Sequence, residues 1–486
     1  DPDVIRVEDT YYMVSTTMHF MPGCEILQSF DLVHWEHVTY VYETLDHTDA
    51  QQLKSGQNIY GQGMWAASLR YHEGRFCICF VANDTRKTYL YTSEKIDGPW
   101  KKQLIEGFYH DGSLLFDEDG RNYIVYGNDE IWITELNEDL TAPKKDGLHR
   151  LLVSDHKNPE LGYEGSHIQK INGYYYIFLI HSLRDRWMRT EACFYSDSLE
   201  GEFTGGDVLC DDRGYCGQGV AQGGIVDTPD GKWYAMLFQD SGAVGRIPIL
   251  VPVTWKDHFP FFGQNGHVPE EIEVHSTRPG YIYQPLVGSD DFCNGLLPHW
   301  QFNHDPDPRY YHLDALQGTY TITTREVCTE LTQAVNTLTQ RMSYPSCAAE
   351  VTVDASALKE GDVAGLCALQ SCYAAVGITK HHGKYEVLML DKKEDGILDM
   401  TEGTVVESHQ MDFRLEADFC NMKDEARCYY RVNKGDWLPI GTVHKLYFKL
   451  DHFTGCRFGL FCYAAEETGG SACFRDFKYY DVDEIS

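Results

Sequence analysis

The sequence has few basic residues for its size and no long apolar run. It carries 41 lysines and arginines against 74 aspartates and glutamates, a formal net charge of −33 at pH 7. Nucleic acids and anionic membranes bind basic patches, so this balance argues against both as partners. No segment reaches the roughly 18 uninterrupted apolar residues of a membrane helix. A neutral ligand is compatible with the composition, although solubility alone accounts for most of the charge.

Cysteine pairs with the spacing of a metal or redox site are also missing. The 16 cysteines include no C-x-x-C pair, which is the spacing of zinc and redox sites. Cys77 and Cys79 lie two residues apart in the apolar run FCICF, so we expect both on one buried face of a strand. Buried free thiols persist most easily in a reducing cytosol, which favours a cytoplasmic protein. The chain begins without Met and without a signal peptide, so we expect that an upstream segment has been removed.

No long amphipathic helix is evident, and repeated aromatic strands take its place. A short apolar strand, a polar turn and an aromatic strand occur five times, and the later part of each copy reads EDTYYMVST, HEGRFCICF, DEDGRNYIVY, INGYYYIFLI or PDGKWYAMLF. The copies begin at residues 1, 66, 111, 164 and 222. Two hairpin strands repeated at this spacing indicate a β-propeller. We predict a five-bladed propeller over residues 1–285.

The first residues of the five repeats are expected to lie together around the propeller axis. The innermost strands point their ends at this axis, so equivalent positions should meet in one pocket. These positions are Asp1, Ala66, Asp111, Glu164 and Gln222. Like charges at close range raise one another's pKa and destabilise a fold, so three converging acids point to chemistry. The alternative is that Asp1 and Asp111 only cap strands or turns; it is weakest for Glu164, because Glu is rarely buried without a role.

Two carboxyl groups on either side of a glycosidic bond are the minimum equipment for hydrolysing a sugar acetal. One must be protonated to donate to the leaving oxygen, and the other must be ionised to activate water or to attack. A third acid nearby can keep the pKa of the donor high through its negative charge. Asp1, Asp111 and Glu164 supply this number and type of groups.

A second β domain follows the repeats. From Ser289 the chain continues as short strands with turn signals between them, among them AAEVTVDAS, KYEVLMLDK and CRFGLFCYA. Strands at regular spacing favour a β-sandwich. The predicted fold class is therefore all-β, with a propeller over 1–285 followed by a sandwich over 289–486.

The repeats resemble the five blades of glycoside hydrolase family 43. The segments that carry the resemblance are PDVIRVEDTYYMVSTTMHF, GMWAASLRYHEGRF, HDGSLLFDEDGRNYIV, YEGSHIQKINGYYYIF and GGIVDTPDGKWY. The branch is that of β-xylosidases and α-L-arabinofuranosidases, and SDDFCNGLLPHWQFNHDPDPRYY is similar to the start of its C-terminal sandwich, a concanavalin-like jelly roll. The resemblance covers essentially the whole chain.

This resemblance implies roles for the three acids in an inverting mechanism. Asp1 corresponds to the general base that activates water, and Glu164 corresponds to the general acid. Asp111 corresponds to the residue that tunes the pKa of the donor and orients it. Inversion implies a separation between base and acid of about 6.5 to 9.5 Å, whereas about 5 Å would indicate a retaining enzyme.

Further residues are expected to bind the substrate. Trp65, directly before the second repeat, could stack on a sugar face or serve as a core aromatic. The resemblance implies that Phe20 forms an aromatic wall of the pocket and that Arg246 bonds sugar hydroxyls; Arg246 would otherwise be an awkward burial within AVGRIPILV. His167 is expected to be structural and bonded to backbone.

Two positions depart from the family pattern. Gln222 stands where the family commonly has His, so we count it with the substrate-binding residues; a central metal is doubtful because Gln is a poor transition-metal ligand. Ala67 and Ser68 stand where relatives often have Pro and Asp, which is expected to reshape the pocket. No cofactor is required for catalysis. In relatives the sandwich closes one side of the pocket and can hold a structural calcium, for which Asp291 and Asp476 are the candidate ligands, or else ordinary surface acids.

The expected function is an inverting exo-acting glycosidase. Its substrates would be xylo- or arabino-oligosaccharides of plant hemicellulose, from which it releases β-D-xylosyl or α-L-arabinofuranosyl ends. An endo-arabinanase, a retaining fructosidase and a non-catalytic sugar-binding propeller remain as alternatives, and a homo-oligomer is compatible with the sequence.

Overall fold

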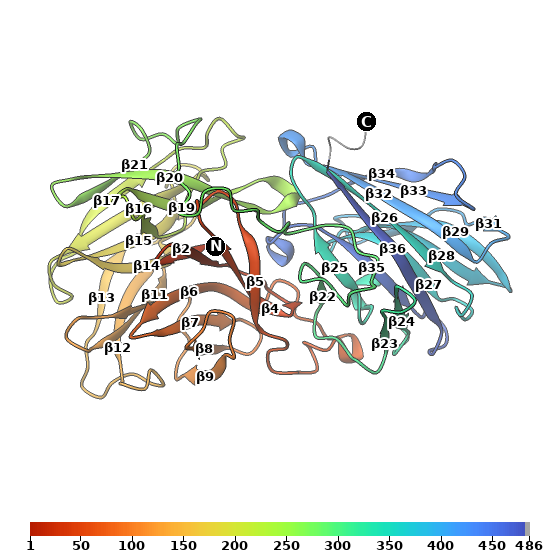
Figure 1. Cartoon of the computed structure of the whole chain (residues 1–486), viewed down its shortest axis with the longest axis horizontal. Coiled ribbons are helices and arrows are strands. Elements are labelled where there is room, and N and C mark those ends of the chain that lie inside the picture. Colours follow the sequence, from red (N-terminus) through yellow and green to blue (C-terminus); the bar gives the residue numbers. More distant parts are fainter. Residues whose placement is uncertain (482–486) are drawn as a thin grey trace.

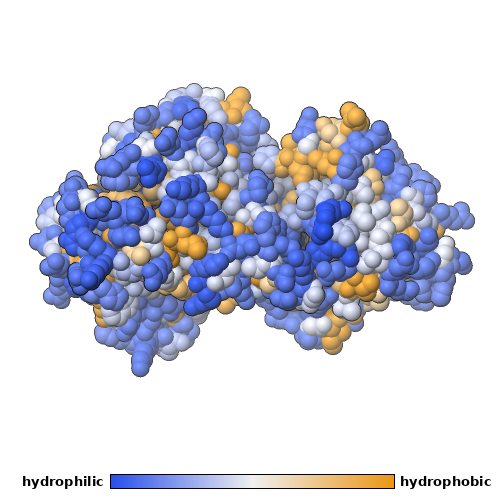
Figure 2. All heavy atoms as spheres, turned by 90° about the horizontal axis from the view of Figure 1, so that it is seen from below, coloured by the Kyte–Doolittle hydropathy of each residue, from blue (hydrophilic) through white to orange (hydrophobic). Residues whose placement is uncertain are grey.

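The computed structural model describes residues 1–481. Two β bodies lie side by side, a propeller coloured red to green and a sandwich coloured teal to blue (Figure 1). Their surface is mostly hydrophilic on the face shown in Figure 2, where apolar atoms gather only in small patches. The end of the predicted sandwich domain, 482–486, lies outside the described residues.

Helical structure is confined to short 3-10 turns in the part of the chain that the structure describes. These turns are η1 (Lys54–Gly56), η2 (Gly242–Val244), η3 (Leu331–Gln333), η4 (Cys420–Met422) and η5 (Leu450–His452). Among residues 1–481, no helix combines the length and the apolar character needed to cross a bilayer.

The predicted five-bladed propeller is confirmed. Each blade is a four-stranded antiparallel sheet, and its strands follow one another in the sequence, with only the short strand β3 left out of the first blade. From the axis outward, the first blade contains β1 (Asp3–Val7), β2 (Thr10–Val14), β4 (Gly23–Ser29) and β5 (Glu36–Tyr42), and the second contains β6 (Met64–His72), β7 (Arg75–Ala82), β8 (Lys87–Ser93) and β9 (Lys101–Ile105). The third contains β10 (Ser113–Phe116), β11 (Asn122–Asn128), β12 (Glu130–Leu136) and β13 (His149–Ser154), and the fourth contains β14 (Glu164–Ile171), β15 (Tyr174–Ser182), β16 (Arg189–Ser196) and β17 (Thr204–Leu209). The fifth contains β18 (Ile225–Asp227), β19 (Trp233–Asp240), β20 (Arg246–Lys256) and β21 (Phe259–Phe262).

The polar turn of each repeat sets the register of the two inner strands. In the fourth blade Asn172 and Gly173 have φ values of 51° and 86°, and in the second blade Glu73 and Gly74 have 48° and 76°. Two successive left-handed residues make a turn whose twist matches the flanking strands, and Asn-Gly is the preferred pair. The register that follows puts Ile171 opposite Tyr174, so the aromatic strand runs back beside the inner one.

Apolar clusters between successive blades hold the ring together. Cys77 and Cys79 are buried in the cluster between the second and third blades, as the run FCICF predicts. The first and fifth blades meet in another cluster, which contains Val4 of β1 and Val226 of β18. Each blade therefore buries its faces against its neighbours, which is what closes a propeller.

Arg70 occupies the propeller axis. Its guanidinium donates to the carboxylate of Asp3 at 2.8 Å, to the hydroxyl of Ser113 at 2.7 Å and to the carbonyl of Ile168 at 3.2 Å. His167 is structural, as expected, but its Nδ1 contacts the Asp3 carboxylate at 3.1 Å rather than backbone. One arginine thus links the inner strands of four blades and compensates an aspartate that is 1% exposed.

The C-terminal body is a sandwich of two antiparallel sheets. One sheet, in spatial order, contains β3 (Phe20–Met21), β22 (Gln301–Asn303), β25 (Leu338–Arg341), β35 (Arg457–Tyr463), β27 (Val363–Leu369), β28 (Ala374–His381), β29 (Lys384–Lys392) and β30 (Leu398–Met400), with β31 (Thr404–Val406) also on β29. The other contains β23 (Tyr311–Asp314), β24 (Thr319–Thr323), β36 (Ser471–Asp481), β26 (Ser346–Asp354), β32 (Gln410–Asp418), β33 (Glu425–Val432) and β34 (Leu438–Lys445). Leu366 and Phe458 of the first sheet and Phe413 of the second lie in the core between them.

The two bodies share a sheet. Strand β3 belongs to the propeller by sequence, yet it pairs with β22 of the sandwich, with Met21 opposite Phe302 and Phe20 opposite Asn303. The chain between the bodies also packs on the first blade, where Thr277 donates to the carbonyl of Asp9 at 2.6 Å. The sandwich is therefore fixed against the first blade by backbone hydrogen bonds.

Replacing Arg70 by methionine should destabilise the propeller. The change keeps side-chain bulk but leaves the buried Asp3 carboxylate with only His167 and the backbone amide of Leu69 as partners. Removing one partner of a buried ion pair costs about 3 kcal/mol or more. Urea unfolding of the purified variant measures this loss. The exposed Arg75 on the same blade is the matched control, because its replacement by methionine should change the unfolding free energy by less than about 0.5 kcal/mol. Equal shifts in the two variants would contradict the axial role of Arg70.

Candidate active site

The three acids of the repeat positions lie at one end of the propeller axis. Asp1 stands two residues before β1, Asp111 stands two residues before β10, and Glu164 is the first residue of β14. The imidazole Nε2 of His110 lies 3.5 Å from Asp111 Oδ2 and 3.4 Å from Glu164 Oε2, so one ring bridges both carboxylates. Asp1 joins the same group through Arg246, whose charge acts on Asp111 and on Glu164.

Asp1 is held by partners on both carboxylate oxygens. Thr16 donates its hydroxyl to Oδ2 at 2.7 Å, and the guanidinium of Arg246 pairs with Oδ1. Arg246 also contacts Asp240 at 3.3 Å, and Asp240 in turn pairs with Arg189 at 3.0 Å. This chain of buried charges fixes the orientation of Asp1 and satisfies its ionised form.

Glu164 is bonded on one oxygen. Asn128 donates its side-chain amide to Oε2 at 2.7 Å, and His110 approaches the same oxygen. Burial acts to raise the pKa of Glu164. The hydrogen bond and the charge of His110 oppose this effect, and together with the charges of Arg189 and Arg246 they lower the pKa of Glu164 below its usual range. The sequence led us to expect an acid whose pKa is held high; the difference arises because a cation lies closer to the carboxylate than sequence alone reveals.

Asp111 has a strained and buried position. Its φ is 47°, and the amide of Gly165 donates to Oδ2 at 3.0 Å. Burial, together with the charge of Glu164, raises the pKa of Asp111 despite the opposing charge of His110. Gly165 itself has a φ of 65° and lies against the side chain of Gln222, which a Cβ at position 165 would approach to 2.6 Å. Glycine is therefore required at this point of the pocket floor.

His110 was not selected by sequence reasoning. The negative charge of Asp111 is the main reason why its pKa is raised, to about 9, with Glu164 adding to the effect and burial opposing it. The imidazole also lies 6.0 Å from the ring of Trp65. The sequence did contain a signal for His110, because it directly precedes Asp111 and the neighbour of a residue at the propeller axis also lies near the axis.

Phe453 is the second residue that the sequence did not disclose. It follows η5 in the sandwich and packs edge-on against Trp65, with ring centroids 5.5 Å apart. The guanidinium carbon of Arg246 lies 4.3 Å from its ring centroid and 4.4 Å from that of Phe238. The sandwich thus lends one aromatic side to the pocket, as the resemblance implies, and Trp65 stands beside it in a half-buried position.

Phe20 does not line the pocket, so that prediction is wrong. Its side chain is 0% exposed and packs among sandwich residues such as Tyr373 and Phe461. The guanidinium carbon of Arg457 lies 3.6 Å from its ring centroid. The physical reason is the pairing of β3 with β22, which carries Phe20 into the sandwich sheet and away from the axis.

Gln222 does reach the pocket floor, beside the acids. It has a φ of 62°, its side chain lies against Gly165, and its backbone amide donates to Glu191 at 2.7 Å. Glu191 is fully buried, and burial raises its pKa well above the usual range. The effect of Ala67 and Ser68 on the shape of the pocket stays a prediction. Both residues are buried, and Ser68 accepts a hydrogen bond from the amide of Leu114 at 3.1 Å, which ties the second blade to the third.

Family models match both bodies of the chain. Residues 1–260 match the glycosyl hydrolases family 43 model, and residues 289–480 match the β-xylosidase C-terminal concanavalin A-like domain. The chain belongs to glycosyl hydrolase family 43. The acids at the propeller axis therefore lie in a glycoside hydrolase domain, and the sandwich is the concanavalin-like domain that the resemblance implies.

Relatives within family 43 agree over most of the chain. A β-xylosidase of Formosa agariphila is 26% identical over 99% of this chain and 87% of its own length. A non-reducing end α-L-arabinofuranosidase of Bacteroides ovatus is 23% identical over 82% of this chain and 78% of its own length. A bifunctional GH43-CE protein of Bacteroides eggerthii has a solved structure with 42% identity and a TM-score of 0.91 over 100% of this chain. The chain spans 62% of that protein's length.

Two groups of residues bear on metal binding. In residues 1–481, His110, Asp111 and Glu164 are the one set of three side chains gathered closely enough to share a cation, with ligand atoms within 4.8 Å of one another. Asp291 and Asp476, the predicted calcium ligands, are both exposed, and the same search of the described residues finds no third acidic or imidazole ligand with them. Calcium at Asp291 and Asp476 stays a prediction, and family 43 hydrolysis requires no catalytic cofactor.

The raised pKa of His110 predicts its titration behaviour. Because the folded-state pKa of about 9 exceeds the ordinary 6.5, the charged ring stabilises the protein fully below pH 6.5, and this contribution is lost as the pH rises towards 9. An NMR titration, with the His110 signal identified by its absence in His110→Phe, should give a midpoint near 9. In Asp111→Asn the midpoint should fall by at least about one unit, because the main cause is removed. Asp119→Asn, on the exposed turn after β10, should leave it unchanged; an equal fall in both variants would contradict the assignment.

Proposed function

We propose that this family 43 enzyme is an inverting exo-acting hydrolase. It releases terminal β-D-xylosyl or α-L-arabinofuranosyl residues, or both, from oligosaccharides of plant hemicellulose. The observation that carries the proposal is the contrast between two acids in one pocket. Asp1 is paired in its ionised form with Arg246, whereas Glu164 has one oxygen occupied by Asn128 and His110.

The mechanism assigns one proton transfer to each acid. Glu164 gives its proton to the glycosidic oxygen as the bond from that oxygen to the anomeric carbon breaks. A water molecule attacks the anomeric carbon from the opposite face, and Asp1 takes the proton that this water loses. The leaving alcohol departs with the proton of Glu164, the configuration inverts, and exchange with solvent restores both acids. The separation of about 6.5 to 9.5 Å that inversion requires stays a prediction.

Glu164 must be protonated before it can act. In the free protein His110 favours the ionised form of Glu164. A sugar that fills the pocket displaces water and deepens the burial of the carboxyl group, which raises its pKa. Substrate binding and protonation of Glu164 are therefore coupled.

The walls of the pocket support the exo mode. Phe453 of the sandwich closes the side on which Trp65 and Arg246 lie, and a wall at this place favours a chain end over an internal bond. The names of the relatives support pentose substrates, because they include a β-xylosidase and a non-reducing end α-L-arabinofuranosidase. An endo-arabinanase would need an open groove across the same face.

Product stereochemistry and a paired assay test the proposed function. Release of nitrophenol from nitrophenyl β-xyloside and nitrophenyl α-arabinofuranoside, run side by side, should reveal cleavage of at least one. Proton NMR during hydrolysis of the β-xyloside should show α-xylose before mutarotation. First appearance of β-xylose would replace inversion by retention, and no release from either substrate would favour the sugar-binding alternative.

Replacing Glu164 by glutamine should affect substrates according to their leaving group. General acid catalysis contributes about 10² to 10⁴-fold, so turnover of xylobiose should fall by that factor. Nitrophenyl xyloside needs little protonation and should lose far less, while xylose binding measured by calorimetry persists. Glu160→Gln, an exposed acid on the loop before β14, is the matched control and should retain activity. Equal losses on both substrates would remove Glu164 from the role of general acid.

Asp1→Asn should behave differently from the Glu164 variant. Water activation is needed whatever the leaving group, so both xylobiose and nitrophenyl xyloside should lose at least about 10²-fold in kcat. Asp9→Asn, at a half-exposed position after β1, serves as the control for the fold. An Asp1 variant that keeps normal activity on the nitrophenyl substrate would sink the assignment of the base.

A further inference from the structure

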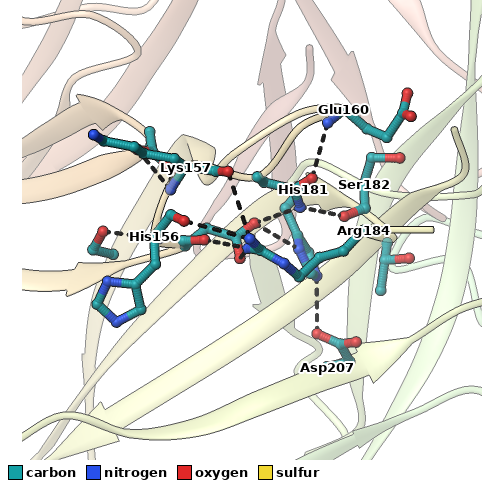
Figure 3. Close-up of polar contacts among 12 residues, drawn as sticks. His156, Lys157, Glu160, His181, Ser182, Arg184 and Asp207 are labelled. Atoms are coloured by element: carbon teal, nitrogen blue, oxygen red, sulfur yellow. Dashed lines mark hydrogen bonds and ion pairs between the residues drawn. The ribbon is translucent and has the colours of Figure 1, made fainter. Parts of the chain in front are cut away.

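An exposed loop rises beside Glu164 on its own blade. It comprises residues 183–188, between β15 and β16. Glu164 pairs with Ile180 of β15, and two residues later Ser182 pairs with Arg189 where β16 begins. The loop therefore leaves the blade at the end that carries the general acid. Figure 3 shows this region, with Arg184 reaching across to the segment that contains His156 and Lys157.

Hydrogen bonds hold this loop in one conformation. The amide of Leu183 donates to the carbonyl of Met188 at 3.1 Å, and the amide of Met188 donates to the Ser182 hydroxyl at 2.8 Å. Arg184 donates to Asp155 Oδ1 at 3.2 Å and to the carbonyl of His156 at 3.4 Å. Asp155 is itself bonded to His181 at 3.1 Å. Hydrogen bonds therefore join the two ends of the loop, and Arg184 attaches it to the segment between β13 and β14.

Trp187 stands on this fastened loop with 45% of its surface exposed. Its ring lies 5.4 Å from the guanidinium carbon of Arg189. Arg189 is 5% exposed and pairs with Asp240, which contacts Arg246, the partner of Asp1. The indole thus packs against Arg189, the first residue of a row of paired charges that ends at Asp1. The rest of the indole surface is open to solvent.

Trp187 presents an open aromatic face on the side of the general acid. Tryptophan combines a large apolar ring with a polar N–H group, and for this reason it is enriched at surfaces that bind partners. A general acid lies next to the oxygen of the leaving group, so the sugar that departs emerges on the side of Glu164. Trp187 rises from that side. The apolar C–H face of a pyranose ring can pack on an indole without losing the hydration of its hydroxyl groups.

We propose that Trp187 is the platform on which the leaving-group sugar stacks. The ligand is a pyranose ring of the oligosaccharide, directly after the bond that is cleaved. Arg189 holds the indole from beneath, so the platform is fixed relative to the catalytic acids. This inference rests on the proposed function, because it assigns a second sugar site to the same reaction.

Two substrates with matched leaving-group chemistry separate stacking from catalysis. Xylobiose and ethyl β-xyloside both release an alcohol whose oxygen must be protonated by Glu164, but only xylobiose places a ring beyond the scissile bond. In Trp187→Ala, kcat/KM for xylobiose should fall about tenfold, which corresponds to about 1.4 kcal/mol. The value for ethyl β-xyloside should stay within about twofold of the wild type. Trp187→Phe keeps an aromatic face and should restore most of the xylobiose activity.

Tyr71→Ala is the matched control. Tyr71 is also 45% exposed but lies near the end of β6, at the opposite end of the propeller axis from Trp65. Its replacement should change neither substrate. An unchanged xylobiose value in Trp187→Ala, or an equal fall on both substrates, would overturn the platform. A wild-type enzyme inactive on both xylosides and on their α-L-arabinofuranosyl counterparts would instead overturn the proposed function, and the platform with it.

Discussion

The ion pair between Arg246 and Asp1 is the contact on which the rest of the active site depends. Arg246 begins β20, the third strand of the fifth blade from the axis, and Asp1 precedes the first strand of the first blade. The pair therefore ties the two ends of the ring together at the place where chemistry is expected. A buried charge is tolerated only when it is paired, and Asp240 shares the arginine to complete that pairing. Phe238 and Phe453 pack against the guanidinium and keep water away, which strengthens each of these electrostatic contacts.

The sandwich contributes to this arrangement through two independent contacts. Phe453 reaches the pocket directly, whereas the pairing of β3 with β22 fixes the first blade to the sandwich by backbone hydrogen bonds. Phe453 can form a wall of the pocket only if the sandwich is held in place against the propeller, and the pairing of β3 with β22 holds it there. The strand exchange therefore supplies the rigidity that a pocket shared between two bodies needs.

The repeat made much of the fold and part of the site predictable. Asp111 and Glu164 could be chosen among 74 acids because the period of the blades puts equivalent positions at one axis. Phe453 could not be chosen, since its contact with the pocket spans most of the chain and depends on how two domains dock. Phe20 was misplaced for the same reason: a two-residue strand that leaves its blade carries no signal in its own sequence. His110 lies between these cases, because its place was implied by the repeat while its effect on the pKa of Glu164 depends on geometry.

The arginine at the propeller axis has a consequence for how the ring responds to its surroundings. Arg70 gives the inner strands a cation that is part of the chain. Such a counterion cannot be diluted, exchanged or removed by a chelator, and a buried pair is screened little by salt, so the contacts that Arg70 makes should depend little on the ionic composition of the medium. The same tether restricts what can change nearby, because any substitution at Asp3 or Ser113 must now accommodate a fixed guanidinium rather than an ion free to adjust its position.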